Sequence, residues 1–136
     1  MSGGLPETAP GAFVAATGFD VAEASGSRVT GVVDLGPDQH TPWGVVHGGV
    51  YCAVVESAAS IGASLAVADR GQFAVGVNNS TDFLRPVTAG RLDVVAEPVQ
   101  QGRTLQLWQV LLTRAEDGKL VARGQVRLQN VPLPGA

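Results

Sequence analysis

The feature that most constrains this 136-residue chain is a proline-free run of small and apolar residues from Gly49 to Asp69. Apolar side chains surround nearly the whole circumference of a helix built from it, so such a helix must be buried on most sides. The overlapping stretch Val45–Val67 is long enough to suggest a membrane span. However, Glu56 lies near its middle, where a charge costs roughly 2.5–3.5 kcal/mol on insertion scales. A buried core helix explains the segment better.

Composition favours one compact domain. Hydrophobic residues make up 45% of the chain and charged residues 15%, which argues against a disordered protein. The net charge of −3, without a dense basic cluster, argues against nucleic-acid binding. The single Cys52 cannot form an internal disulfide and fits a reducing cytoplasm. We expect a flexible leader at 1–9 without a secretory signal, one domain over 10–130, and a tail at 131–136.

Turn residues divide the chain into two helices and six strands. The predicted order is a short helix over 11–17, strands over 19–24 and 28–34, a loop over 36–42, the long helix over 49–69, and strands over 73–83, 91–97, 104–113 and 120–128. The turns between the last four strands are short enough for consecutive strands to be antiparallel neighbours. This order predicts an α+β fold, in which a curved antiparallel sheet of about six strands wraps around one long helix.

A His-Gly-Gly turn begins the long helix, and Glu56 is the only ionisable residue between His47 and Asp69. The first N–H groups of a helix lack an acceptor, so Gly48 and Gly49 could donate to a ligand oxygen. Equally, they could only allow a tight turn. A lone carboxylate on an apolar helix persists if it is bonded, paired or open to a cleft, so Glu56 is a candidate base or nucleophile. The alternative is a carboxylate at a subunit boundary.

Two further polar residues flank these groups. Ser60 lies one turn after Glu56 on the same helix face, where its hydroxyl could hold the carboxylate or a water, although small packing residues are the commoner case. His47 could position a ligand carbonyl or brace the turn. The two histidines and the helix carboxylate lack the spacing of metal ligands, so we expect no metal site.

The segment Asn78–Val87 ends a strand with polar residues, among them Asn79 and Thr81, and then places Arg85 before a proline. Arg85 could clamp a phosphate, as could Arg103 together with the Thr104 hydroxyl. Taken alone, each of these arginines is more commonly a solvated side chain of a loop.

Three segments carry a specific combination of motifs, each weak alone: Trp43-Gly-Val-Val-His-Gly-Gly-Val-Tyr-Cys-Ala with Glu56, Ala74-Val-Gly-Val-Asn-Asn, and Phe83-Leu-Arg-Pro-Val87. On these residues, and over roughly 19–128, the chain closely resembles hotdog-fold acyl-CoA thioesterases. Within them it is most similar to the PaaI-like branch and its 4-hydroxybenzoyl-CoA thioesterases, which carry the acid on the central helix.

The resemblance implies that Glu56 is the nucleophile or general base and that the Gly48 N–H polarises the thioester carbonyl. It also implies that His47 shapes the turn and that Ser60 assists the acid or a water. One departure is Thr41, which stands where close relatives have a Gln that orients the thioester. Gln39 and His40 are the candidates to replace that Gln. The expected substrate-binding residues are Thr41, Gly49, Asn79, Thr81, Arg85, Arg103 and Thr104, the last three at the CoA phosphates.

We therefore expect a cytoplasmic acyl-CoA thioesterase for an aromatic acyl group of benzoyl or phenylacetyl type, with no cofactor beyond the CoA of the substrate. The alternative is a non-catalytic hotdog module that binds acyl-CoA. The family assembles its active sites between two subunits and commonly forms tetramers, so a homo-oligomer, either a dimer or a dimer of dimers, is expected. The physiological acyl group, and the choice between a covalent anhydride and general-base catalysis, stay open.

Overall fold

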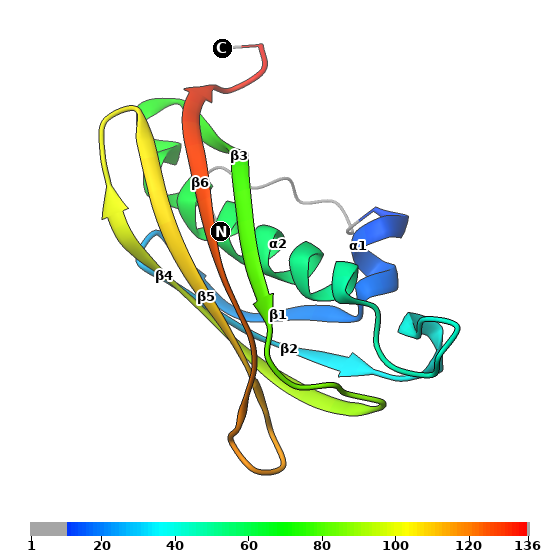
Figure 1. The fold of residues 1–136 in the computed structure, drawn as a ribbon. Helices are drawn as coiled ribbons and strands as arrows, with labels where there is room; N and C mark the ends of the chain where they lie inside the picture. Colours follow the sequence, from blue (N-terminus) through cyan, green and yellow to red (C-terminus); the bar gives the residue numbers. More distant parts are fainter. Residues whose placement is uncertain (1–10, 136) are drawn as a thin grey trace.

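A computed structural model describes residues 11–135, in which a six-stranded antiparallel sheet curves around one long helix, α2 (Gly48–Val67) (Figure 1). The other elements are α1 (Ala12–Thr17), β1 (Phe19–Ser25), β2 (Arg28–Leu35), η1 (Pro37–Gln39), η2 (Ala68–Arg70), β3 (Gln72–Phe83), β4 (Gly90–Gln101), β5 (Leu105–Arg114) and β6 (Leu120–Pro132). The predicted α+β architecture is confirmed. The expected leader at 1–9 lies outside the described residues.

Small side chains let the sheet approach α2 closely. Val55, Ala58, Ala59 and Ala63 are fully buried between the helix and the sheet. A Cβ at Gly62 would collide with the fully buried ring of Trp108 from β5, so glycine is required there. Gly48–Arg70 is also long and apolar enough to cross a membrane, with a mean hydropathy of 1.6. Half of that window is buried inside the fold, as in a core helix.

The strand order is β1-β2-β4-β5-β6-β3, so the expectation that β3 and β4 are neighbours is wrong. Instead β2 pairs with β4 and β3 pairs with β6. Three strand spacings separate β3 from β4, about 14 Å in a flat sheet. The six-residue connection over 84–89 can reach about 20 Å when extended, so its length did not require a hairpin. β3 and β1 are therefore the two edges of the sheet.

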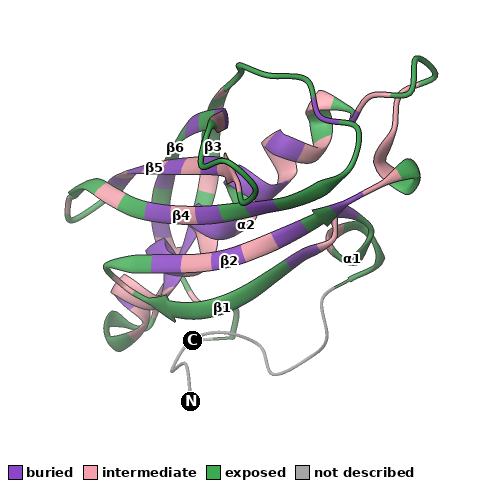
Figure 2. Ribbon diagram, turned by 90° about the horizontal axis from the view of Figure 1, so that it is seen from below, coloured by how far each residue is buried: buried purple, intermediate pink, exposed green. Residues whose placement is uncertain are grey.

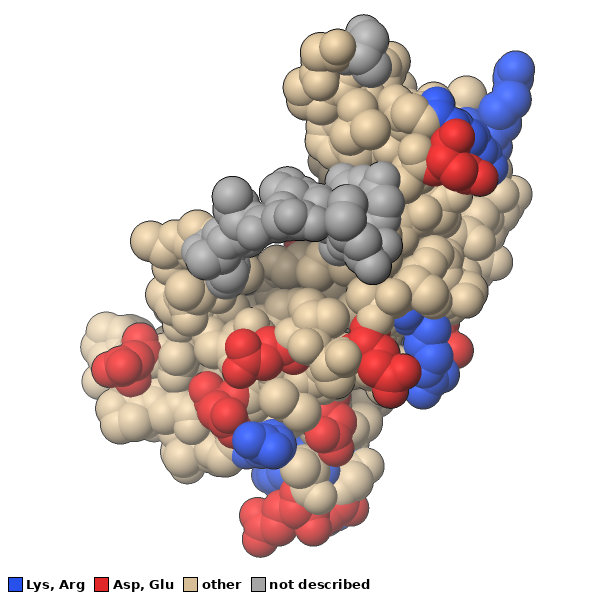
Figure 3. Space-filling view, turned by 180° about the vertical axis from the view of Figure 1, so that it is seen from behind, with Lys and Arg blue, Asp and Glu red and all other residues tan. Residues whose placement is uncertain are grey.

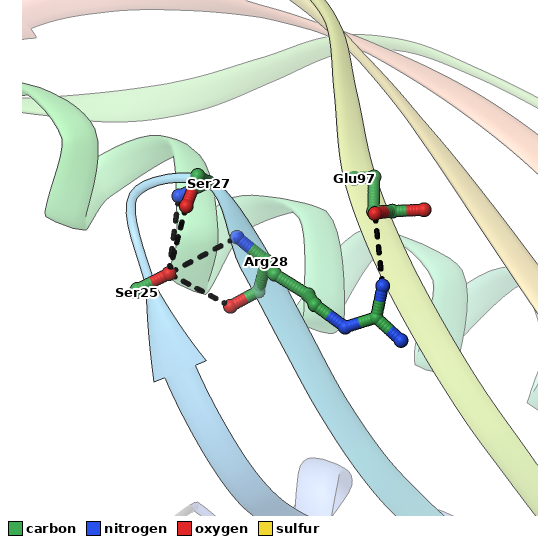
Figure 4. A network of polar contacts seen from close by, with 4 residues as sticks. All are labelled: Ser25, Ser27, Arg28 and Glu97. Atoms are coloured by element: carbon green, nitrogen blue, oxygen red, sulfur yellow. Dashed lines mark hydrogen bonds and ion pairs between the residues drawn. The ribbon is translucent and has the colours of Figure 1, made fainter.

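Strands β2 and β4 each turn one face to the core, as the alternation of buried and more exposed residues along them shows (Figure 2). The predicted hairpin between β1 and β2 is confirmed, and the Ser25 hydroxyl accepts the N–H groups of Ser27 and Arg28 (Figure 4). The Arg28 guanidinium then pairs with Glu97 of β4 at 2.9 Å. β6 runs to Pro132, four residues beyond its predicted end, because β3 pairs with it from Gln72 onward.

Candidate active site

The first turn of α2 is organised by His47, which caps the helix. Its Nδ1 accepts the Gly49 N–H at 2.8 Å, so the ring proton is on Nε2. The His47 N–H donates to the Gln39 carbonyl at 2.8 Å, which ties the cap to the preceding loop. The two free donors expected from the sequence are thus reduced to one. The Gly49 N–H is occupied, whereas Gly48 is the first helical residue and its N–H has no acceptor within the helix.

Gly48 lies under the ring of Phe83, which comes from the end of β3, and a Cβ at residue 48 would collide with that ring. The Phe83 ring packs at a tilt against Tyr51, with 5.6 Å between the ring centroids. Burial raises the pKa of Tyr51, and its hydroxyl has no partner among the described residues. A cavity of about 250 Å³ opens here, lined by Val45, Val46, Gly48, Tyr51, Phe83, Leu84, Arg85 and Pro86. Arg85 therefore lies at the Gly48 end of the helix.

Glu56 lies on the face of α2 that the sheet leaves uncovered, and its side chain is exposed in the single chain. It opens into a groove of about 720 Å³, lined by Phe13, Val14, Gly49, Cys52, Ala53, Glu56, Ser57, Ser60, Ile61 and Asn79. The back of the molecule is hollowed, and the surface around the hollow carries mainly uncharged side chains (Figure 3). A Cβ at Gly76 of β3 would be 3.3 Å from Glu56 Oε2, so the carboxylate rests on a strand position without a side chain. The groove brings Glu56 and Ser60 together.

Two polar residues of β3, Asn79 and Thr81, lie on the face toward α2. Asn79 Nδ2 donates to the carbonyl of Cys52 at 3.0 Å, and the Thr81 hydroxyl donates to Asn79 Oδ1 at 2.7 Å. Asn79 also lines the groove. That Asn79 and Thr81 contact substrate stays a prediction, and the contact of Glu56 with Gly76 was not foreseen.

The loop before α2 holds the residues that were expected to replace the missing Gln. Thr41 Oγ1 accepts the Trp43 N–H at 3.2 Å. The Gln39 amide accepts the Gly36 N–H and donates to the Ala16 carbonyl, while His40 Nε2 donates to the Thr88 carbonyl. The side chains of Gln39 and His40 thus serve the loop itself.

The turn between β4 and β5 carries Arg103 and Thr104. A cavity of about 310 Å³ beside it is lined by Gln100, Gly102, Thr104, Leu105, Gln106, Leu107 and Arg127. No local motif singles out Arg127, because only the pairing of β5 with β6 brings it opposite Leu107. Arg85 does not line this cavity.

Buried amides fix that turn. Asn130 Nδ2 donates to the Arg103 carbonyl at 3.1 Å, and Asn130 Oδ1 accepts from Gln106 Nε2 at 2.8 Å. Gln106, only 2% exposed, also donates to the Ala63 carbonyl of α2 and accepts the Trp108 indole N–H. Residues 11–135 contain no cluster of three or more His, Cys, Asp or Glu side chains that could hold a metal.

A curved sheet around one helix, with a single carboxylate opening into a groove on the uncovered helix face, has the architecture of a hotdog thioester hydrolase. Residues 44–121 match the model of the thioesterase superfamily, and the chain belongs to that family. The predicted hotdog thioesterase family and the predicted enzyme class are thereby confirmed.

The relatives agree in sequence and in fold. Rv1847 of Mycobacterium tuberculosis, which carries an esterase name, is 43% identical over 121 residues, 88% of this chain and 86% of its own. Its structure gives a TM-score of 0.85 over 89% of this chain and 97% of its own, at 42% identity. AziG of S. sahachiroi also gives 0.85, at 46% identity over 90% and 98% of the two chains. The 1,4-dihydroxy-2-naphthoyl-CoA thioesterase 2 of Arabidopsis thaliana is 37% identical over 101 residues, 73% of this chain and 62% of its own.

The cap at His47 generates a prediction about stability. His47→Ala removes the acceptor of the Gly49 N–H and should lower the free energy of unfolding by about 1 kcal/mol, as for other N-cap losses. His47→Asn retains a side-chain acceptor at the cap and should lose less. Urea unfolding of the two variants measures the difference, and equal losses would show that the cap bond contributes nothing.

Proposed function

We propose that this protein hydrolyses an acyl-CoA thioester with an aromatic acyl group, as a member of the PaaI-like branch, and that Glu56 carries the reaction. The observation that supports this most directly is the position of Glu56, the only carboxylate among the residues lining the 720 Å³ groove. Phe13 and Ile61 give that groove apolar walls suited to an aryl group. The Arabidopsis relative is named as a 1,4-dihydroxy-2-naphthoyl-CoA thioesterase, which supports the same substrate class.

Two routes use Glu56. In the first, its carboxylate attacks the thioester carbon, the C–S bond breaks, CoA leaves as thiolate, and water then hydrolyses the mixed anhydride. In the second, Glu56 accepts a proton from the water that attacks the carbon and passes it to the leaving thiolate. Both routes consume one water and give a free acid and CoA. In both, the Gly48 N–H stabilises negative charge on the carbonyl oxygen.

The spacing of these groups supports a site shared between two subunits. Gly48 and Glu56 are eight residues apart on α2, about 12 Å along the helix axis. One carbonyl spans much less, because its oxygen must lie about 2.9 Å from the N–H and its carbon about 3–3.5 Å from the attacking atom. We infer that Glu56 of one chain acts with Gly48 of a second copy.

The edge strand β3 supports the same assembly. Its outer edge has no strand partner in the described chain, and it exposes Val75 (40%) and Val77 (55%) beside Gly76, on which Glu56 rests. A long apolar edge of this kind is covered in most proteins. A second copy of the chain would cover it next to the groove, giving a dimer or a dimer of dimers.

The CoA nucleotide would be held by cations that have no ion-pair partner in the described chain. Arg85 lies at the Gly48 cavity, and Thr104 and Arg127 line the cavity beside Arg103. Arginine guanidinium groups bind phosphates by charge-assisted hydrogen bonds. The proposed reaction needs no cofactor or metal. The unpaired Cys52 agrees with a cytoplasmic location.

Glu56→Gln tests the proposal. The variant should fold normally and lower kcat at least ~100-fold, the scale of losing a general base. Release of free CoA thiol from benzoyl-CoA and phenylacetyl-CoA measures the rate, and Asp69→Asn at the end of the same helix region is the matched carboxylate-to-amide control. Wild-type turnover by Glu56→Gln would remove Glu56 from the chemistry. Binding of acyl-CoA without any turnover by the wild type would favour the non-catalytic module.

Mixed oligomers test the shared site. Gly48→Pro removes the donor at a helix position that tolerates proline, and Phe83→Ala in the same chain provides space for the ring. Co-expression of this double variant with Glu56→Gln should restore activity to about a quarter of the sites, because half of random dimers are mixed and each has one intact site. If both groups act within one chain, the mixture stays inactive. A fully active monomer in sedimentation would also overturn the shared site.

Arg85→Ala separates substrate binding from chemistry. A contact with the remote nucleotide contributes the same binding free energy in the ground state and in the transition state. Its loss should therefore raise KM more than it lowers kcat. The expected cost is about 1.5–3 kcal/mol with acyl-CoA, the range of charge-assisted hydrogen bonds, and much less with acyl-pantetheine. Equal losses with both substrates would assign Arg85 a structural role.

A further inference from the structure

The turn of α2 that precedes Glu56 is fixed to β3 by two side chains that the proposed chemistry does not use. Asn79 Nδ2 donates to the Cys52 carbonyl at 3.0 Å, and the Thr81 hydroxyl donates to Asn79 Oδ1 at 2.7 Å. The second bond orients the amide, because only Oδ1 can accept and only Nδ2 can then face the helix. Both bonds are partly buried.

The carbonyl that Asn79 binds belongs to the hydrogen-bond ladder of Glu56. In an α-helix each N–H donates to the carbonyl four residues earlier, so the Glu56 N–H and the Asn79 amide share the Cys52 oxygen. The Glu56 carboxylate then rests on Gly76, three residues before Asn79 on the same strand. Strand β3 therefore holds Glu56 at its backbone and at its carboxylate.

A β-bulge makes this double contact geometrically feasible. Side chains alternate along a regular strand, so residues three apart face opposite sides. Here the pairing of β3 with β6 shifts between Gly76 and Asn78, and Val77 is the additional residue. The shift brings Gly76 and Asn79 to the same face, toward α2. Bulges are frequent beside active sites, where they redirect a side chain.

Strand β6 leaves room for the second member of the pair. Thr81 is opposite Gly124, and a Cβ at Gly124 would be 2.6 Å from Thr81 Oγ1 and 2.6 Å from Val55 Cγ1. The Thr81 hydroxyl thus occupies a space enclosed by β6 and α2. The Asn79 amide is therefore oriented toward the turn that carries Glu56 by the bulge in β3, by the space at Gly124 and by the Thr81 hydroxyl.

We propose that Asn79 and Thr81 are positioning residues that hold the Glu56 carboxylate in its attacking geometry, rather than residues that bind the substrate. The inference rests on the proposed role of Glu56. A displacement of a catalytic group by about 1 Å can cost on the order of 100-fold in rate. The loss should therefore fall on kcat, and it should be the same for long and truncated thioesters.

Steady-state kinetics with benzoyl-CoA and benzoyl-pantetheine test the pair. Asn79→Ala and Thr81→Val should lower kcat about 10- to 100-fold with both substrates and leave KM within about 2-fold. Thr81→Ser retains the hydroxyl, so its kcat should stay within about 3-fold of the wild-type value. Ser80→Ala, between the two on the opposite face of β3, is the matched control and should be unchanged. A rise in KM at constant kcat would make these residues substrate ligands and overturn the proposal.

A double variant identifies the group through which the pair acts. If Asn79 acts through Glu56, then Asn79→Ala should cause no further loss of the residual rate in a Glu56→Gln background. An additive loss would show that Asn79 acts independently and would overturn the inference.

A measurement without substrate keeps this inference separate from the proposed reaction. Asn79→Ala should increase amide hydrogen exchange at Glu56 about 5-fold relative to the Ser60 amide, because one bond to the Cys52 carbonyl is lost, and Ser80→Ala should not. If the wild type hydrolyses no thioester, the proposed function fails while this exchange still reports the positioning. Unchanged exchange at Glu56 would overturn the positioning itself.

Discussion

The close packing of α2 against the curved sheet is the contact on which the other elements depend, because the sheet can approach the helix closely only where small residues on one surface face the large side chains of the other. Gly62 leaves space for the Trp108 ring, and Gly124 leaves space for Val55. Burial of valines and alanines along this contact removes apolar surface from water and stabilises both layers together. The sheet covers one side of the helix only, so the opposite side is available for a site.

The uncovered face of α2 explains how a carboxylate can persist on such an apolar helix. Glu56 avoids the cost of burial because it opens into a groove instead of the core. Its neighbours there are Gly76, which adds no side chain, and the helix turn fixed by Asn79. Edge strand β3 therefore supports Glu56 and also presents the apolar edge against which we propose that a second copy of the chain packs.

A second set of buried polar contacts fixes the other end of the sheet. Gln106 connects the Ala63 carbonyl of α2 with Asn130, and Asn130 holds the carbonyl groups of the turn that carries Arg103. Buried amides are costly unless every group is paired, and here each amide has partners on the helix or on the turn. The turn that we assign to CoA phosphates is therefore anchored to the same helix as Glu56, which makes the distance between the two regions a fixed property of the fold.

The sequence by itself determined the central helix, the six strands, and the isolation of Glu56 after a His-Gly-Gly turn, because hydrophobic periodicity and turn residues are local signals. The order of the strands was decided by tertiary structure, since a six-residue connection permits both a hairpin and a crossing. Tertiary structure also decided that Arg127 lies beside Thr104 and that a bulge at Val77 turns Asn79 toward the helix. Each of these depends on pairing between segments distant in the chain, and no spacing within one segment encodes it.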